Sequence, residues 1–168
     1  FMFKHIREQL DIESFVSFNG QYVVFEGNVI YKNPLNKVQL RQLEKHTHKN
    51  GHPMVYLNEE TMKSSVSHHP YIQESMDSLD FPHPEEDAIF YEKKEIYQAL
   101  VFCKHEDESL YLDGYDEFGF VRWHRVSTDV VPTGGTKAEG IKEMIKRLNI
   151  SMEDVYAFGD GLNDIEML

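Results

Sequence analysis

The sequence predicts an α/β protein with an α+β middle section. Its last part, from Thr128, runs strand, loop, helix, apolar strand and the start of another helix, an order typical of a parallel sheet covered by helices. Residues 22–125 instead mix short strands and helices without regular alternation, which favours an α+β region. The 168 residues are 40% hydrophobic and 27% charged, so the chain is long enough and apolar enough to bury a core.

The chain is acidic, because 17 Lys and Arg residues face 29 Asp and Glu, for a formal charge of −12. Such a surface repels phosphate backbones and lipid headgroups, and we see no basic cluster that offsets it, so we expect no nucleic-acid or membrane partner. Cys103 is the only cysteine, which indicates a reducing compartment. With no apolar run near roughly 20 residues and no signal pattern, a cytoplasmic protein is expected. The sequence does not indicate the oligomeric state.

The first 31 residues predict a helix followed by short strands. Phe3, Ile6 and Leu10 have helical spacing. The first strand is closed by an Asn-Gly dipeptide at 19–20, whose residues tolerate positive φ, and the next two strands flank a second turn. The expected strands are 15–18, 21–25 and 29–31.

The middle section predicts helices and strands of ordinary length. Apolar residues at helical spacing begin at Leu35 and end near Gly51, and a second set runs from Ile72 to Leu79. Strand formers dominate three other stretches, of which the second is expected to be largely buried. These stretches are 54–57, 96–103 and 118–126.

The last part predicts a βαβα unit. Residues 128–131 form a strand, and a helix begins at Thr136, where Thr136 and Glu139 have the spacing of a capping box. Residues 155–158 (Val-Tyr-Ala-Phe) show no polar alternation, so we expect a strand that is covered on both faces.

The loop after this strand carries the densest set of polar side chains. Asp160, Asn163 and Asp164 lie on a glycine-containing loop where a strand of an open sheet is expected to end, which is where such sheets bind ligands. Carboxylates are the protein ligands that Mg²⁺ takes, usually one or two with phosphate and water completing the shell. The alternative is structural, because Asp and Asn are also common in turns and helix caps.

Lys137 is the second candidate. It lies in the first turn of the helix after Gly134-Gly135, where an ammonium opposes the helix dipole but, together with the free N–H groups, would attract an anion. Taken alone, Lys137 is better explained as a solvated lysine. Beside Asp160 on the next loop it suits a complex of Mg²⁺ with a phosphate group.

Histidines and aromatic residues offer weaker candidates. His48 and His52 are four residues apart, but Gly51 and Pro53 interrupt the helix, so surface histidines explain them better than a zinc site. An aromatic group in the middle section is explained better by a core than by a substrate pocket. Its members are Tyr115, Phe118, Phe120 and Trp123.

Two segments closely resemble the haloacid dehalogenase-like (HAD) phosphatases of the Cof type. They are Lys-Ala-Glu-Gly-Ile at 137–141 and Phe-Gly-Asp-Gly-Leu-Asn-Asp-Ile-Glu-Met-Leu at 158–168. The segment Phe-Val-Ser-Phe-Asn-Gly at 15–20 is similar to the point where that family leaves its core for its cap. The resemblance covers essentially the whole chain. It implies a Rossmann-like HAD core, here only partly present, with an inserted α+β cap domain.

By this resemblance, residues 1–21 and 126–168 are core fragments and residues 22–125 are the cap. Lys137 would hold the phosphoryl group, Asp160 would bind Mg²⁺, Asn163 would contact the substrate phosphate and Asp164 would support the metal site. The implied activity is Mg²⁺-dependent hydrolysis of a small phosphorylated metabolite through an aspartyl-phosphate.

One departure from the family pattern is large. The family's nucleophile lies in an Asp-x-Asp-Gly-Thr strand, and these 168 residues contain no Asp-x-Asp. Phosphoryl transfer to an aspartate needs that aspartate, so the intact protein is expected to be a phosphatase and this chain alone to be inactive. The alternative is a non-catalytic module that binds a small ligand or a partner.

Overall fold

The computed structural model describes residues 2–168, apart from the side chains of residues 162 and 163. The chain forms two compact units. The first combines Phe1–Asn33 with Gly134–Leu168, and the second is Pro34–Thr133. The second unit is therefore inserted in the sequence of the first, and the chain passes between them twice.

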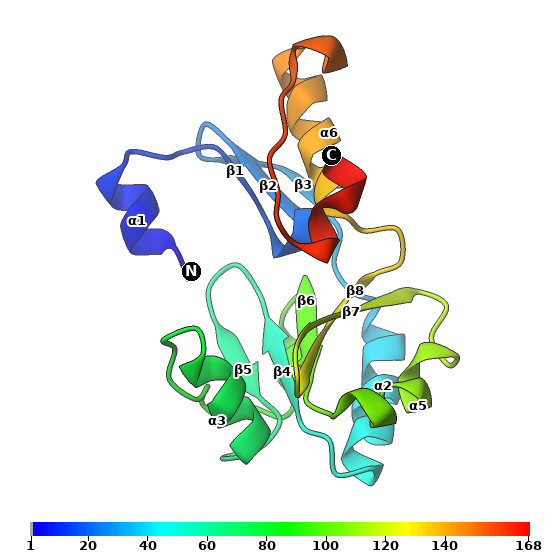
Figure 1. Ribbon diagram of the computed structural model, residues 1–168. Helices are drawn as coiled ribbons and strands as arrows, with labels where there is room; N and C mark the ends of the chain where they lie inside the picture. Colours follow the sequence, from blue (N-terminus) through cyan, green and yellow to red (C-terminus); the bar gives the residue numbers. More distant parts are fainter. Residues whose placement is uncertain (1) are drawn as a thin grey trace. The chain divides into compact units, whose positions relative to one another are not determined.

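The first unit contains a small antiparallel sheet covered by one long helix. Its strands pair in the order β1-β2-β3, and the helix α6 packs against all three (Figure 1). The β2–β3 turn has positive φ at Glu26 (48°) and Gly27 (73°). The expected opening of helix, strand and hairpin is confirmed. Its elements are α1 (Lys4–Gln9), β1 (Phe15–Ser17), η1 (Phe18–Gly20), β2 (Tyr22–Phe25), β3 (Asn28–Lys32), α6 (Lys137–Leu148), η3 (Met152–Asp154) and η4 (Leu162–Met167).

Capping residues define both ends of the helix α6. The Thr136 side chain accepts a hydrogen bond from the Glu139 N–H at 3.4 Å, which is one half of the predicted capping box, while the Glu139 carboxylate accepts from Lys142 Nζ at 2.6 Å. At the other end Asn149 adopts a left-handed conformation (φ 54°), which allows its N–H to bond the last carbonyls. The buried face carries Ala138, Gly140 and Ile145.

The second unit is a five-stranded antiparallel sheet with helices on both faces. The strand order is β5-β4-β6-β8-β7. Helices α2, α4 and α5 cover one face, and α3 lies on the other (Figure 1). The strands are β4 (Met54–Leu57), β5 (Met62–Ser64), β6 (Gln98–Val101), β7 (Phe118–His124) and β8 (Ser127–Pro132); the helices are α2 (Lys37–Lys49), α3 (Pro70–Asp77), α4 (Phe90–Lys93), η2 (His105–Asp107) and α5 (Ser109–Leu112).

Alternation along the central strands builds the main core of this unit. The side chains of Tyr56 in β4 and Val101 in β6 lie on the same face of the sheet and belong to one buried cluster with Leu43 of α2. All three are fully buried. Tyr115 and Phe118 belong to this cluster, which confirms the interpretation of these aromatic residues as core.

Of the two histidines considered for a zinc site, His48 is exposed and His52 has a structural partner. The Nδ1 atom of His52 lies 2.5 Å from the Tyr111 hydroxyl. Over residues 2–168, leaving aside the side chains of 162 and 163, no group of three His, Cys, Asp or Glu side chains could hold a metal ion. None of the described helices is long and apolar enough to cross a membrane.

The predicted βαβα unit is wrong. The strand β8 is antiparallel to both β6 and β7, so it belongs to the second unit instead of a parallel sheet. Residues 155–158 form no strand, since no described strand is hydrogen-bonded to them, and Tyr156 and Phe158 are 85% and 87% exposed.

The limits of the units also differ from the expected limits at 21 and 125. Because β2 and β3 pair with β1, residues 22–33 belong to the first unit, and β8 carries the second unit on to Thr133.

Candidate functional site

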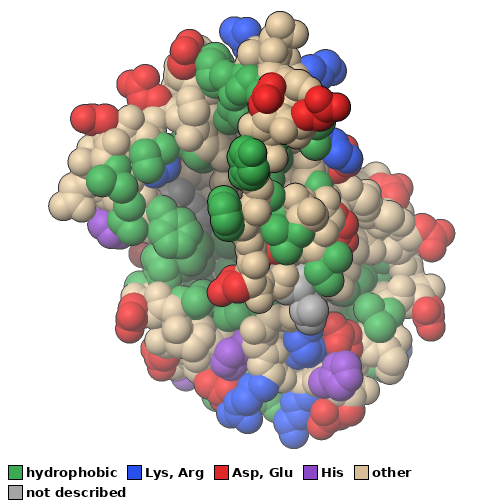
Figure 2. All heavy atoms as spheres, turned by 45° about the horizontal axis from the view of Figure 1, so that its top comes forward, with side chains coloured by type: hydrophobic (Ala, Val, Ile, Leu, Met, Phe, Trp, Pro, Cys, Tyr) green, Lys and Arg blue, Asp and Glu red, His purple; other side chains and the backbone are tan. Residues whose placement is uncertain are grey.

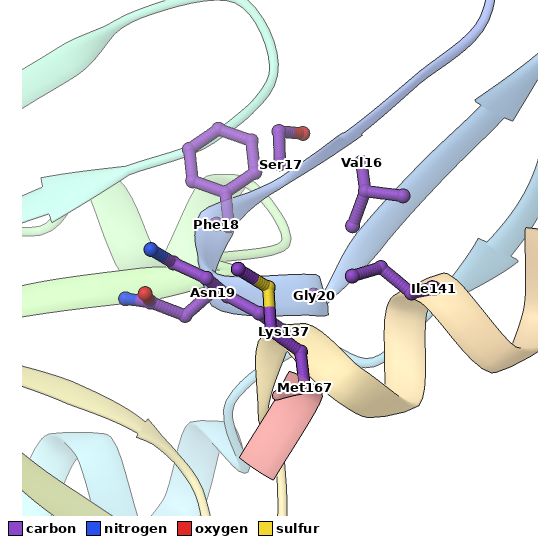
Figure 3. Close-up of a pocket in the computed structure, with 8 residues that line it drawn as sticks. All are labelled: Val16, Ser17, Phe18, Asn19, Gly20, Lys137, Ile141 and Met167. Atoms are coloured by element: carbon purple, nitrogen blue, oxygen red, sulfur yellow. The ribbon is translucent and has the colours of Figure 1, made fainter. Parts of the chain in front are cut away.

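A pocket of about 300 Å³ lies within the first unit, between the β1–β2 connection and the start of α6. Figure 3 shows that three segments far apart in the sequence line it: β1 with η1, the first turns of α6, and η4. The lining residues are Val16, Ser17, Phe18, Asn19, Gly20, Lys137, Ile141 and Met167. Hydroxyl, amide and ammonium groups therefore share one cavity with apolar side chains.

Two glycines let α6 approach the β1–β2 connection at backbone distance. A Cβ atom on Gly20 would lie 2.0 Å from the Thr136 carbonyl oxygen, and one on Gly140 would lie 2.6 Å from the Gly20 Cα. No side chain can be inserted at either position without moving the helix. This close packing places Lys137, next to Thr136, at the edge of the turn that carries Asn19.

The turn itself has an unusual backbone. Phe18, Asn19 and Gly20 have φ values of 52°, 50° and 93°, so three successive residues are left-handed. This region is costly for phenylalanine and tolerated by asparagine and glycine. The strained run turns the chain sharply between β1 and β2, and its side chains at 18 and 19 reach the pocket.

The Lys137 side chain is held by Asp164. Its Nζ donates to Asp164 Oδ1 at 2.6 Å, and the other oxygen, Oδ2, accepts from the N–H groups of Asp160 (3.2 Å) and Gly161 (3.0 Å). Asp164 is 7% exposed at its side chain and Lys137 34%. The Lys137 hydrogen bond and these N–H groups hold the pKa of Asp164 below its ordinary value. The aspartate is thus charged, and it fixes both the lysine and the preceding loop.

The predicted site residues are brought together in part. Lys137 meets Asp164 directly, whereas Asp160 joins the pair through its backbone N–H and its side chain is exposed. The fourth predicted residue, Asn163, has a side chain that lies outside the described part of the structure.

Comparison with known proteins places this arrangement in a family. The family model for haloacid dehalogenase-like hydrolases matches residues 1–168. The chain belongs to this family. The HAD phosphatase resemblance of its motifs is confirmed at the level of the family.

Similar proteins extend beyond the span of this chain. A Bacillus subtilis (strain 168) protein named "Putative phosphatase YkrA" is 52% identical over the whole chain, which covers 65% of its length. A crystal structure from Geobacillus kaustophilus HTA426 is 62% identical, with a TM-score of 0.92 over 100% of this chain and 66% of its own. The HAD sugar phosphatase BT4131 is 26% identical, with a TM-score of 0.84 over 99% and 64%. The chain thus spans about two thirds of each relative.

The loop at 160–164 carries two carboxylates, Asp160 and Asp164, a number that is compatible with a Mg²⁺ site. Mg²⁺ commonly takes one or two carboxylates and keeps several waters. Both Asp164 oxygens already accept hydrogen bonds, whereas the Asp160 carboxylate is exposed on the same loop and would be the more available of the two to a cation. Asp164 would support the site by ordering that loop.

Sequence reasoning missed Ser17 and Asn19 as pocket residues. The Asn-Gly dipeptide signals a turn, and the structure confirms the turn, but only packing against α6 places its side chains beside Lys137. No local pattern carries that information.

Proposed function

We propose that the protein containing this HAD chain is a Mg²⁺-dependent phosphatase that hydrolyses a small phosphorylated metabolite through an aspartyl-phosphate. The observation that carries the proposal is the Lys137–Asp164 pair at a pocket that also holds a hydroxyl and an amide. The names of related phosphatases support it.

The lysine is suited to bind phosphoryl oxygens. An ammonium has three donors, and the bond to Asp164 uses one of them. Since Asp164 is itself fixed by two backbone N–H groups, the lysine is preorganised, which is the condition under which a charge stabilises a transition state most effectively. The Asn19 amide would add a hydrogen bond to the bound group, and Ser17 would do so only by giving up the bond that its hydroxyl donates to the Tyr22 carbonyl at 3.2 Å.

Mg²⁺, when bound at Asp160, would supply further positive charge against the phosphate. The nucleophile is proposed to be an aspartate outside these 168 residues, since they contain no Asp-x-Asp. Its carboxylate oxygen would form a bond to phosphorus as the ester P–O bond breaks and the leaving alcohol takes a proton; water would then release phosphate and restore the carboxylate.

The second unit is proposed to be the cap of the enzyme. It is an independent α+β body inserted at 34–133, and caps of this kind select substrates by shape. BT4131 is named a sugar phosphatase, which supports a small phosphorylated metabolite as substrate. A single buried thiol, Cys103, supports the cytoplasm as its compartment.

The experiment compares two lysines of α6 in the full-length protein. We expect hydrolysis of p-nitrophenyl phosphate with Mg²⁺, lost on chelation by EDTA, and a fall in kcat/KM of about 100-fold or more for Lys137→Ala, as for removal of a preorganised charge. Lys142→Ala, which breaks only an exposed pair with Glu139, should leave kcat/KM unchanged. The 168-residue chain alone should show no turnover.

Two results would contradict the proposal. Equal activity of the wild type and Lys137→Ala would remove the lysine from the mechanism. No turnover of any phosphate monoester by the full-length protein would favour the non-catalytic binding module instead.

A further inference from the structure

Gln21 has a buried side-chain amide whose nitrogen and oxygen both form hydrogen bonds. It is 1% exposed, and its Nε2 donates to the Asn19 carbonyl at 2.7 Å. Its Oε1 accepts from the Asn33 side chain at 2.8 Å, while the Asn33 backbone N–H donates to the Gln21 carbonyl at 2.9 Å. A buried amide with such partners is costly to replace, because each lost bond leaves a polar group unpaired.

The backbone at Gly135 lies against the same amide. A Cβ atom on Gly135 would be 2.5 Å from both Nε2 and Oε1 of Gln21 and 2.7 Å from the Cδ between them. These distances mean that Gly135 packs directly against the polar end of the amide, about equally close to its nitrogen and its oxygen. No other amino acid fits at 135 while Gln21 keeps its position.

The three partners of Gln21 are Asn19, Asn33 and Gly135, which lie at the pocket and at the two connections between the units. Asn19 lines the pocket, and its carbonyl belongs to the left-handed turn. Asn33 is the last residue of the first unit before the chain enters the second, and Gly135 follows the point where the chain returns. Gly135 also precedes Thr136 and Lys137. One side chain therefore joins the pocket turn, the outgoing connection and the start of the lysine helix.

We propose that Gln21 is a positioning residue, which holds the Asn19 turn and the first turn of α6 in one arrangement so that Lys137 and Asn19 face the same bound phosphate. The proposal rests on the proposed function, since it assigns Gln21 a task in that pocket. Gln21 is not among the residues that line the pocket, so it acts through its neighbours.

The first part of the test measures the packing of Gly135 on Gln21 in the 168-residue chain. Gly135→Ala should lower the hydrogen-exchange protection of the Val23 backbone amide in β2, because the new methyl group displaces the nearby side chain of Gln21. In a Gln21→Ala background the same substitution should have little further effect, since the space is then free. Gly114→Ala, where nothing lies within 4 Å of the added Cβ, is the matched control and should change nothing.

The second part measures positioning in the full-length protein. We expect Gln21→Ala to weaken inorganic phosphate as a competitive inhibitor about tenfold and to lower kcat/KM by a similar factor. Gln21→Glu, which keeps the acceptor for Asn33 but loses the donor to Asn19, should show the same weakening. An Asn33→Ala variant, which releases only the outgoing connection, should affect phosphate less.

The outcomes separate the two proposals. The positioning role would be overturned if Gly135→Ala lowered the protection of the Val23 amide equally in the wild type and in the Gln21→Ala background. It would also be overturned if a folded Gln21→Ala protein had a phosphate inhibition constant within twofold of wild type. Absence of turnover in the wild type would contradict the proposed function alone, because phosphate binding could still be measured directly by titration.

Discussion

At the scale of single residues, Asp164 and Asp160 have different tasks although they share one loop. Asp164 is buried and bonded at both oxygens, to Lys137 and to the N–H groups of residues 160 and 161, whereas Asp160 is exposed. The sequence motif predicted that both would lie near the lysine, but it could not say which one holds it. That choice depends on how the loop folds back, which local residue types do not determine.

The lowered pKa of Asp164 has a consequence for stability at acidic pH. Because the folded chain favours the ionised form, Asp164 contributes stability above the ordinary aspartate pKa of about 3.9, and this contribution disappears as the pH falls through the lowered value. We expect Asp164→Asn to be less stable than wild type at neutral pH and to lose less stability on acidification.

Hydrogen exchange of α6 amides from pH 6 down to pH 2.5 measures this difference. Asp160→Asn removes the neighbouring carboxylate but not the bond to Lys137, so its pH dependence should match wild type. Parallel curves for wild type and Asp164→Asn would contradict the role given to the pair.

At the scale of elements, those defined by local patterns were predictable and those that depend on partners were not. The Thr136 cap of α6 is local, as are the turns that separate β1, β2 and β3. The strands β6, β7 and β8 were all predicted from the sequence, but the pairing of β8 with β6 and β7 was not, because pairing joins residues far apart in the chain. Residues 155–158 are apolar without a strand partner, so composition alone misidentified them.

The cap of α6 allows a prediction at this scale, because it fixes the helix turn that carries Lys137. Thr136→Ala should cost about 1 kcal/mol of helix stability, since the Glu139 N–H loses its side-chain acceptor. Thr136→Ser keeps the hydroxyl and should be close to wild type. The amide exchange rates of Glu139 and Gly140 report the difference, and equal protection in Thr136→Ala and wild type would show that the cap contributes nothing.

At the scale of the whole molecule, the pocket is made by one unit although its residues come from the two ends of the chain. The β1–β2 connection and α6 are separated in sequence by the entire second unit, and they meet through Gly20 and Gly140. The sequence motifs predicted Lys137 and the two aspartates as candidates. They could not bring Ser17, Asn19 or Gln21 to them, because that requires the packing of distant segments. Asp and Glu side chains are visible on the face of the molecule shown in Figure 2, as expected from the formal charge of −12.

The central claim is that this pocket binds a phosphoryl group through Lys137, and a titration of the 168-residue chain with inorganic phosphate, followed by NMR of the lysine side chains and backbone amides, tests it most directly. We predict saturable shifts of the Lys137 ammonium and of the Asn19 and Gly20 amides, with an affinity at least tenfold weaker in Lys137→Met and unchanged in Lys142→Met. Shifts confined to other parts of the chain, or equal affinity in Lys137→Met and wild type, would contradict the claim.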